Sequence, residues 1–260
     1  MRSEGRLPHF IIGGAPRTGT TFLCQALDRH PDVYLAKPFS PEPKIFMGPP
    51  QELAVYHDRY ARLFTAARPG QALGEKTTNY FESARCCALI RRTLPEVRLL
   101  FIVREPVARA YSNFLWSTKN GLETLSFEEA VRLEGQRPDP LPPGHEHARP
   151  FDYVIRGAYD AFAATYYEAL GRERVAFFLY EALVSEPARV LRDIQAFIGV
   201  PSRALPVDDL GLVNSAREVG PPLAPDLERT LRARLAPAVR RFRALTGLDL
   251  GLWGYDAAPS

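Results

Sequence analysis

The chain has 260 residues, which is long enough to bury a complete core, and α/β chains of this length commonly form one domain. Its 33 basic side chains exceed the 30 acidic ones by a formal charge of +3, too little to indicate a nucleic-acid-binding protein. No apolar run approaches the roughly 18 residues of a membrane span, and charged residues and a proline occupy the place of a signal-peptide core. We therefore expect a cytoplasmic protein with a single domain over residues 1–260, without a nucleic-acid partner or a membrane span.

Strand-like and helix-like segments alternate along the chain. Short apolar runs that end at glycine or at a charged residue predict strands, and apolar side chains spaced along one helical face predict helices. The predicted strands are 9–14, the beginning of 31–46, the beginning of 72–81, 97–104 and 174–183. The predicted helices are 20–30, 56–64, 105–117, 157–170, 185–199 and 229–245. This alternation predicts an α/β fold in which helices cover both faces of a mostly parallel sheet.

Helix starts and one irregular stretch punctuate this pattern. Pro106 marks the beginning of one helix, and Ser185 with Pro187 marks another. Residues 117–152 contain RPDPLPPGHEHARP and are too irregular for a core element, so we predict a flexible flap there. The H-x-H formed by His145 and His147 has no third ligand in view, which favours a polar flap over a metal site.

The segment from Gly14 to Thr21, GAPRTGTT, follows the first predicted strand and opens the first predicted helix. It matches the phosphate-binding pattern G-x-x-x-x-G-K-[ST] except at the lysine, where Thr20 stands. A nucleoside triphosphatase uses that lysine on the β- and γ-phosphates and a strand-end aspartate for magnesium, but the comparable strand here ends at Arg104. The loop, with Arg17 as its cation, is therefore suited to a single 5′-phosphate and its leaving group.

A second strand-to-helix junction carries another pair of phosphate-binding candidates. Arg104 stands at the carboxyl end of the strand 97–104, and Ser112 follows eight residues later on the next helix. Ligands of open α/β sheets collect at the carboxyl ends of the strands. A nucleotide with phosphates at both its 5′ and 3′ positions would suit such a site.

Taken in order, these motifs resemble those of the PAPS-dependent sulfotransferases, where PAPS is 3′-phosphoadenosine 5′-phosphosulfate. They are most similar to heparan sulfate and related carbohydrate sulfotransferases and their bacterial relatives. The resemblance covers residues 9–200 and rests on the segments GAPRTGTTFLCQALDRHPDV, EPKIF, GEKTTNYF, LLFIVREPVARAYSNF and GAY. It implies a P-loop-like three-layer α/β/α fold with a mostly parallel central sheet. It also implies metal-independent, in-line transfer of the sulfuryl group from PAPS to a hydroxyl of a small-molecule or carbohydrate acceptor, with PAP as the product.

The resemblance assigns roles to single residues. It implies that the nucleotide is bound by Arg17, Thr18, Gly19, Thr20 and Thr21 at the 5′ end, by Arg104 and Ser112 at the 3′-phosphate, and by Arg217 in a late loop. It implies Glu42 as the general base, with Arg17 and Lys76 stabilising the charge that develops during transfer. Many members of the family have lysine at the position of Arg17, and arginine would hold the transferred group with a fixed fork of donors.

The sequence also departs from the heparan-modifying enzymes. It lacks their disulfide-bonded hairpin near the C-terminus and their secretory anchors, which favours an intracellular acceptor. Cys24, Cys86 and Cys87 cannot all pair and are expected to be reduced structural thiols. High usage of Ala, Arg and Pro suggests a GC-rich, bacterial genome and a role in tailoring secondary metabolites.

Other interpretations remain open at the level of sequence. Glu42 lies between two prolines, where a carboxylate is commonly only solvated, and Lys76 could pair with Glu75 or Glu82. An ATP-dependent small-molecule kinase with an atypical loop is the alternative enzyme, although the missing loop lysine weighs against it. A non-catalytic nucleotide-binding module would keep both phosphate sites and would not depend on Glu42.

Overall fold

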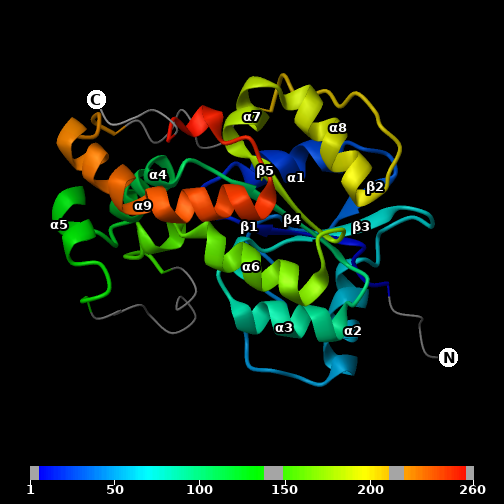
Figure 1. The fold of residues 1–260 in the computed structure, drawn as a ribbon. Coiled ribbons are helices and arrows are strands. Elements are labelled where there is room, and N and C mark those ends of the chain that lie inside the picture. Colours follow the sequence, from blue (N-terminus) through cyan, green and yellow to red (C-terminus); the bar gives the residue numbers. More distant parts are fainter. Residues whose placement is uncertain (1–5, 138–148, 211–219, 256–260) are drawn as a thin grey trace. The chain divides into compact units, whose positions relative to one another are not determined.

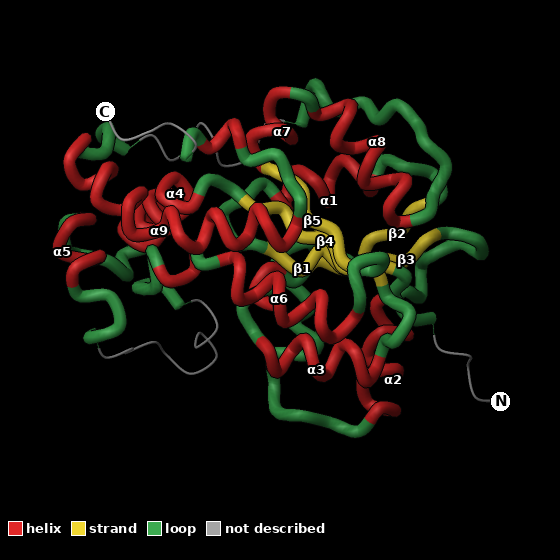
Figure 2. The backbone as a smooth tube through the Cα atoms, viewed as in Figure 1, coloured by secondary structure: helices red, strands yellow, loops and turns green. Residues whose placement is uncertain are grey.

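The fold is built around one five-stranded sheet. A computed structural model describes residues 6–137, 149–210 and 220–255. The strand order is β2-β3-β1-β4-β5, and the four pairings between neighbouring strands are all parallel. The strands are β1 (Phe10–Gly14), β2 (Val33–Leu35), β3 (Ala72–Lys76), β4 (Arg98–Val103) and β5 (Val175–Leu179). The predicted parallel sheet is thereby confirmed, and Figure 2 shows the strands in yellow among the helices.

The two inner strands show why the apolar runs form strands. All five residues of β1 are buried, and so are five of the six residues of β4. Strands that carry helices on both faces have no solvent-facing side and therefore read as continuous apolar runs. The register places Phe10 of β1 beside Gly74 of β3 and Arg98 of β4.

The helices confirm most of the predicted pattern. They are α1 (Thr20–Asp28), α2 (Leu53–Leu63), α3 (Ala84–Thr93), α4 (Pro106–Lys119), α5 (Phe127–Arg132), α6 (Tyr159–Leu170), α7 (Tyr180–Ser185), α8 (Pro187–Ile198) and α9 (Pro225–Thr246). Three short 3-10 helices are η1 (Thr78–Tyr80), η2 (Ile155–Gly157) and η3 (Gly251–Trp253). None of the helices in the described ranges combines the length and the apolar character that a membrane crossing requires.

Three elements differ from the sequence-based prediction. Helix α3 was not predicted, and Ser83 caps it by accepting a hydrogen bond from the backbone N–H of Cys86. The predicted strand 174–183 ends at Leu179 and continues as helix α7. Helix α8 does begin at Pro187, but the Ser185 hydroxyl donates to the carbonyl of Glu181 instead of capping it.

Part of the predicted flap is regular structure. Helix α5 lies within residues 117–152 and begins with a capping box, in which Ser126 and Glu129 bond each other's backbone N–H groups. Residues 138–148, which include His145 and His147, lie outside the described residues.

The chain divides into two compact units. The sheet unit consists of Met1–Val103 and Thr165–Val213, and the helical unit consists of Arg104–Ala164 and Asn214–Ser260. The sheet unit contains all five strands, with α1, α7 and α8 on one face of the sheet and α2 and α3 on the other (Figure 1). Helix α6 contributes residues to both units.

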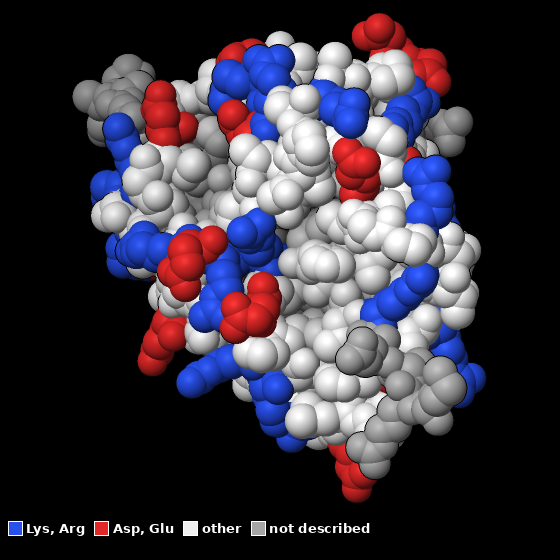
Figure 3. All heavy atoms as spheres, turned by 90° about the vertical axis from the view of Figure 1, so that its right-hand side faces the viewer, with Lys and Arg blue, Asp and Glu red and all other residues white. Residues whose placement is uncertain are grey.

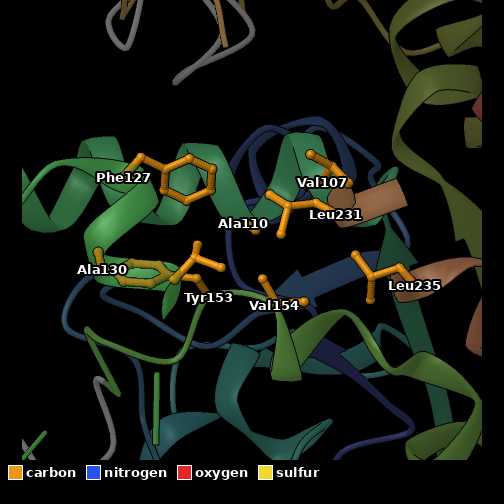
Figure 4. Packing of buried hydrophobic residues seen from close by; sticks show 9 residues of the cluster. Val107, Ala110, Phe127, Ala130, Tyr153, Val154, Leu231 and Leu235 are labelled. Atoms are coloured by element: carbon orange, nitrogen blue, oxygen red, sulfur yellow. The ribbon is translucent and has the colours of Figure 1, made fainter. Parts of the chain in front are cut away.

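The helical unit has its own apolar core. Nine buried side chains form this cluster. They come from α4, α5, α9 and the two residues directly before η2, and Figure 4 shows Phe127, Val154 and Leu235 among them. The ring of Phe127 lies 5.1 Å from that of Phe114 and 6.1 Å from that of Tyr153. Burying such apolar and aromatic surface holds α4 in place, and α4 is the helix that carries Ser112 of the second predicted phosphate site.

Charged side chains of both signs are mixed on the surface. On the face drawn in Figure 3, Lys and Arg side chains alternate with Asp and Glu side chains over short distances. This mixture agrees with the small net charge of +3.

The three cysteines are buried and free of disulfide bonds, and burial raises the pKa of the Cys24 thiol to about 12.

Candidate active site

The predicted phosphate loop connects β1 to α1 within the sheet unit. Gly14 has a φ of 146°, and a Cβ atom there would lie 2.5 Å from the carbonyl oxygen of Thr78 and 2.9 Å from the Cβ of Phe81. Gly19 has a φ of 78° and lies directly before α1. Both positions favour glycine because φ is positive, and at Gly14 the loop also turns sharply against the residues that follow β3.

The loop ends in an uncapped helix start. No side chain caps α1 at Gly19, and its first-turn N–H groups have no carbonyl partner within the helix. The Thr18 hydroxyl donates to the carbonyl of Ala15 at 2.6 Å and closes the turn, in which Arg17 adopts a φ of 70°. Backbone N–H groups and the positive end of the helix dipole favour an anion at this position.

Glu42 is held in a fixed position by Thr78. The backbone N–H of Thr78 donates to Oε2 of Glu42 at 3.0 Å, and the Thr78 hydroxyl lies 3.1 Å from Oε1 and 3.2 Å from Oε2. The Glu42 side chain is only 16% exposed. It is therefore not the freely solvated loop carboxylate that its two flanking prolines suggest.

Lys76 connects this carboxylate to the phosphate loop. It is the last residue of β3, its side chain is 8% exposed, and its Nζ lies 3.2 Å from Oε1 of Glu42. The same Nζ lies 3.5 Å from the hydroxyl oxygen of Thr21 in the first turn of α1. The structure thus brings together three of the predicted site residues, Thr21, Glu42 and Lys76, and the ion pair of Lys76 is with Glu42 rather than with its neighbour Glu75.

The loop that carries Glu42 is fastened to the segment after β3. The backbone N–H of Lys44 donates to the hydroxyl of Thr77 at 3.1 Å, and that of Phe46 donates to the Tyr80 hydroxyl at 3.2 Å. The Phe46 ring packs 5.7 Å from the ring of Tyr80. These contacts fix the backbone that directly follows Glu42.

A second carboxyl group lies buried beside the site. Glu75 precedes Lys76 in β3, is fully buried, and accepts a hydrogen bond of 2.9 Å from the Tyr60 hydroxyl. Burial raises the pKa of Glu75 to about 7, although hydrogen bonds from Tyr60 and Tyr80 act in the opposite direction and lower it. Sequence reasoning treated Glu75 only as a possible partner of Lys76, and no local pattern indicates its burial.

The second predicted phosphate site lies in the helical unit. Arg104 is the first residue of that unit, and its carbonyl accepts a hydrogen bond of 2.9 Å from the Tyr159 hydroxyl. The carboxylate of Glu105 caps α4 by accepting from the N–H of Ala108, and Ser112 is a buried residue of the same helix. Arg217 lies outside the described residues.

Within the sheet unit, this arrangement can perform two kinds of chemistry. The N–H groups at the start of α1, the hydroxyls of Thr20 and Thr21, and the Lys76 ammonium can all donate to an anionic phosphate or sulfate group. The Glu42 carboxylate beside them can accept a proton from a hydroxyl group. Among the residues that the structure describes, no group of three or more His, Cys, Asp or Glu side chains is placed to hold a metal ion.

Comparison with solved structures supports the fold. A crystal structure of a sulfotransferase from Alicyclobacillus acidocaldarius superimposes with a TM-score of 0.76 and 30% sequence identity, covering 96% of this chain and 99% of that one. A crystal structure of mouse sulfotransferase SULT7A1 complexed with PAP superimposes with a TM-score of 0.59 at 15% identity, over 97% and 90% of the two chains. The predicted P-loop-like α/β fold is therefore confirmed.

Comparison of sequences points to the same group of proteins. Mouse heparan sulfate glucosamine 3-O-sulfotransferase 3B1 is 26% identical over 267 residues, which cover 95% of this chain, and this chain spans 65% of that protein's length. The mouse 3A1 enzyme is also 26% identical, and the chain spans 64% of its length. The model of the sulfotransferase family matches residues 50–204, which include Lys76, Arg104 and Ser112 but neither the phosphate loop nor Glu42. Because this match covers more than half of the chain, the chain belongs to the sulfotransferase family.

Proposed function

We propose that this protein transfers the sulfuryl group of PAPS to a hydroxyl group of a small-molecule or carbohydrate acceptor. The observation that carries the proposal is the position of Lys76, whose Nζ lies 3.2 Å from Glu42 and 3.5 Å from Thr21 of the phosphate loop. A cation and a carboxylate beside an anion-binding helix start are the groups that sulfuryl transfer to a hydroxyl needs. The sulfotransferase family and the fold support this reaction.

PAPS, when bound, supplies the sulfuryl group and leaves as PAP. The backbone N–H groups of residues 18–21 and the hydroxyls of Thr20 and Thr21 bind the 5′-phosphate at the start of α1. Arg17 and Lys76 neutralise the charge that grows on the bridging and sulfuryl oxygens. Glu42 takes the proton of the acceptor hydroxyl, a contribution typically worth about 10²- to 10⁴-fold in rate.

The proposal assigns the 3′-phosphate to Arg104 and Ser112, with Arg217 over the nucleotide. Tyr159 supports this assignment of Arg104, because its hydroxyl fixes the Arg104 carbonyl at 2.9 Å. The PAP bound by mouse SULT7A1 is a nucleotide with a 3′-phosphate, and its chain shares this fold. The ATP-dependent kinase is not favoured, because Thr20 stands where the loop lysine would be and Arg104 follows β4 in place of a metal-binding aspartate.

The acceptor is proposed only by its chemical class. The heparan sulfate glucosamine 3-O-sulfotransferases, as their names state, act on a carbohydrate hydroxyl. A location in the cytoplasm and a role in bacterial secondary metabolism belong to the same proposal and await their own tests.

Calorimetric titration of the purified protein with PAP, AMP and Mg-ATP tests the donor site. We expect PAP to bind more tightly than AMP without magnesium. We expect Arg104→Ala to weaken the binding of PAP while leaving the binding of AMP nearly unchanged. Arg229→Ala is the matched control, because Arg229 is an arginine of the same unit whose side chain is 76% exposed. A preference for Mg-ATP over PAP would overturn the proposed function.

Activity of a Glu42→Gln variant then separates an enzyme from a nucleotide-binding module. We expect a loss of about 10²- to 10⁴-fold in the rate of PAP formation with any hydroxyl acceptor that supports turnover. Unchanged turnover in this variant would remove Glu42 as the base.

A further inference from the structure

The pairing of Lys76 with Glu42 has a consequence for the order of events at this site. Both side chains are largely shielded from water, at 8% and 16% exposure, so their attraction is weakly screened. The distance of 3.2 Å between Nζ and Oε1 is that of a direct ion pair. At this distance the two opposite charges neutralise each other.

This pairing conflicts with the roles of both groups in catalysis. The proton of an acceptor must reach a lone pair of Glu42, but Oε1 already faces the Lys76 ammonium and Oε2 accepts from the N–H of Thr78, which leaves each oxygen with fewer acceptor sites. The positive charge of Lys76 is needed at the sulfuryl oxygens, but it is directed to a carboxylate. In the observed arrangement, base and cation are paired with each other.

A second position for the Lys76 ammonium lies at Thr21. Nζ of Lys76 already lies 3.5 Å from the Thr21 hydroxyl, at the helix start where an anion is favoured. A lysine side chain ends in three donors on a flexible stem and can redirect them with small torsional changes. Glu42 cannot follow in the same way, because Thr78 donates to it through both its backbone N–H and its hydroxyl.

We propose that binding of the phosphosulfate anion at residues 18–21 draws Lys76 away from Glu42 and so frees Oε1 to accept the acceptor proton. This inference rests on the proposed function and adds a coupling to it: the base becomes available only after the donor is bound. Lys76 is thus the exchanged partner, and Thr78 is the positioning residue that keeps Glu42 in place during the exchange.

The exchange predicts a specific coupling in donor affinity. Since PAPS must compete with Glu42 for Lys76, removing the carboxylate charge releases the lysine and strengthens PAPS binding. We expect Glu42→Gln to lower the Kd of PAPS about tenfold, because the gain in affinity should be comparable to the strength of a partly buried ion pair. Part of any gain comes from simple removal of a negative charge near an anion, so the single variant does not decide the matter.

A double-mutant cycle in calorimetric PAPS binding separates the two effects. Simple charge removal acts whether or not Lys76 is present, whereas the exchange needs the lysine. Glu42→Gln should therefore improve PAPS affinity several-fold more in the otherwise native chain than in the Lys76→Met background. Lys76→Gln serves as a second background should the Met variant not fold, and Glu52→Gln, at an exposed position, controls for net charge.

Each outcome of this experiment has a distinct meaning. A larger effect of Glu42→Gln in the presence of Lys76 supports the exchange. An equal effect in both backgrounds overturns the exchange while the proposed donor site stands, because PAPS still binds. Failure of the folded native chain to bind PAPS at all would instead overturn the proposed function on which the exchange rests.

Discussion

Glu75 is the residue whose ionisation affects the stability of the fold most directly. It is fully buried in β3, and its pKa of about 7 lies above the usual 4.5 of a glutamate. Because the folded state holds the proton more tightly than the unfolded state, its contribution to stability is complete below about pH 4.5. That contribution is lost as the pH rises through about 7, where the buried carboxyl must ionise.

We expect Glu75→Gln to remove this dependence on pH. A rise in pKa from 4.5 to about 7 changes the free energy of unfolding by roughly 3 kcal/mol, so the variant should gain up to that amount over the native chain at pH 8.5 and little at pH 5. Urea denaturation of both proteins at the two pH values measures the difference. The exposed Glu52→Gln variant should show the native pH dependence, and a Glu75→Gln chain that does the same would mean that Glu75 is not the responsible group.

At the scale of an element, the first turn of α4 depends on Glu105. Its Oε2 caps the helix by accepting from the N–H of Ala108 at 2.6 Å, and its Oε1 accepts from the Tyr255 hydroxyl at 2.7 Å. The guanidinium of Arg232 in α9 lies 3.5 Å from the same Oε1. The C-terminal part of the helical unit therefore fixes the residue that directly follows Arg104.

We expect Glu105→Ala to lower the free energy of unfolding by about 2 kcal/mol, from a lost cap and an unpaired Tyr255 hydroxyl. It should also weaken PAP binding, because the backbone beside Arg104 becomes looser. Chemical denaturation and calorimetric titration measure the two effects. Glu105→Gln keeps a capping oxygen and should lose less stability, and Glu128→Ala, an exposed glutamate of the same unit, should change neither quantity.

The elements also show what a sequence can and cannot predict. Strands β1 and β4 were predictable because burial on both faces requires continuous apolar runs. Helix α3 was missed because its sequence, ARCCALIRRT, mixes charged and buried residues, although Ser83 before it is an N-cap signal that could have identified it. The segment 174–183 was assigned to one strand because the aromatic run VAFFL obscures the change to helix at Tyr180.

The candidate site shows the same division between local and distant information. The phosphate loop was predictable, because its glycines and its place between strand and helix are local features. The environment of Glu42 was not, because its partner Thr78 is 36 residues away and meets it only through the parallel arrangement of the strands. Local sequence around Glu42, with its two prolines, suggested exposure.

At the scale of the whole molecule, ligand binding should appear as a change in the stability of the chain. A ligand that binds only the folded state at about 100 times its Kd adds roughly 2.7 kcal/mol. For a chain of this length, that amount raises Tm by roughly 5 °C. We expect PAP to produce such a rise without magnesium, and AMP at the same concentration to produce less.

The comparison between arginine variants makes this thermal shift specific. At a fixed PAP concentration, Arg104→Ala should reduce the rise in Tm because this variant has a larger Kd for PAP. Arg229→Ala should show the same rise as the native chain. Each variant is measured against its own Tm without nucleotide, so that a lower intrinsic stability does not count as weaker binding. An undiminished rise with Arg104→Ala would mean that this arginine does not contact the nucleotide, and the 3′-phosphate would then have to be assigned to other cations of the chain.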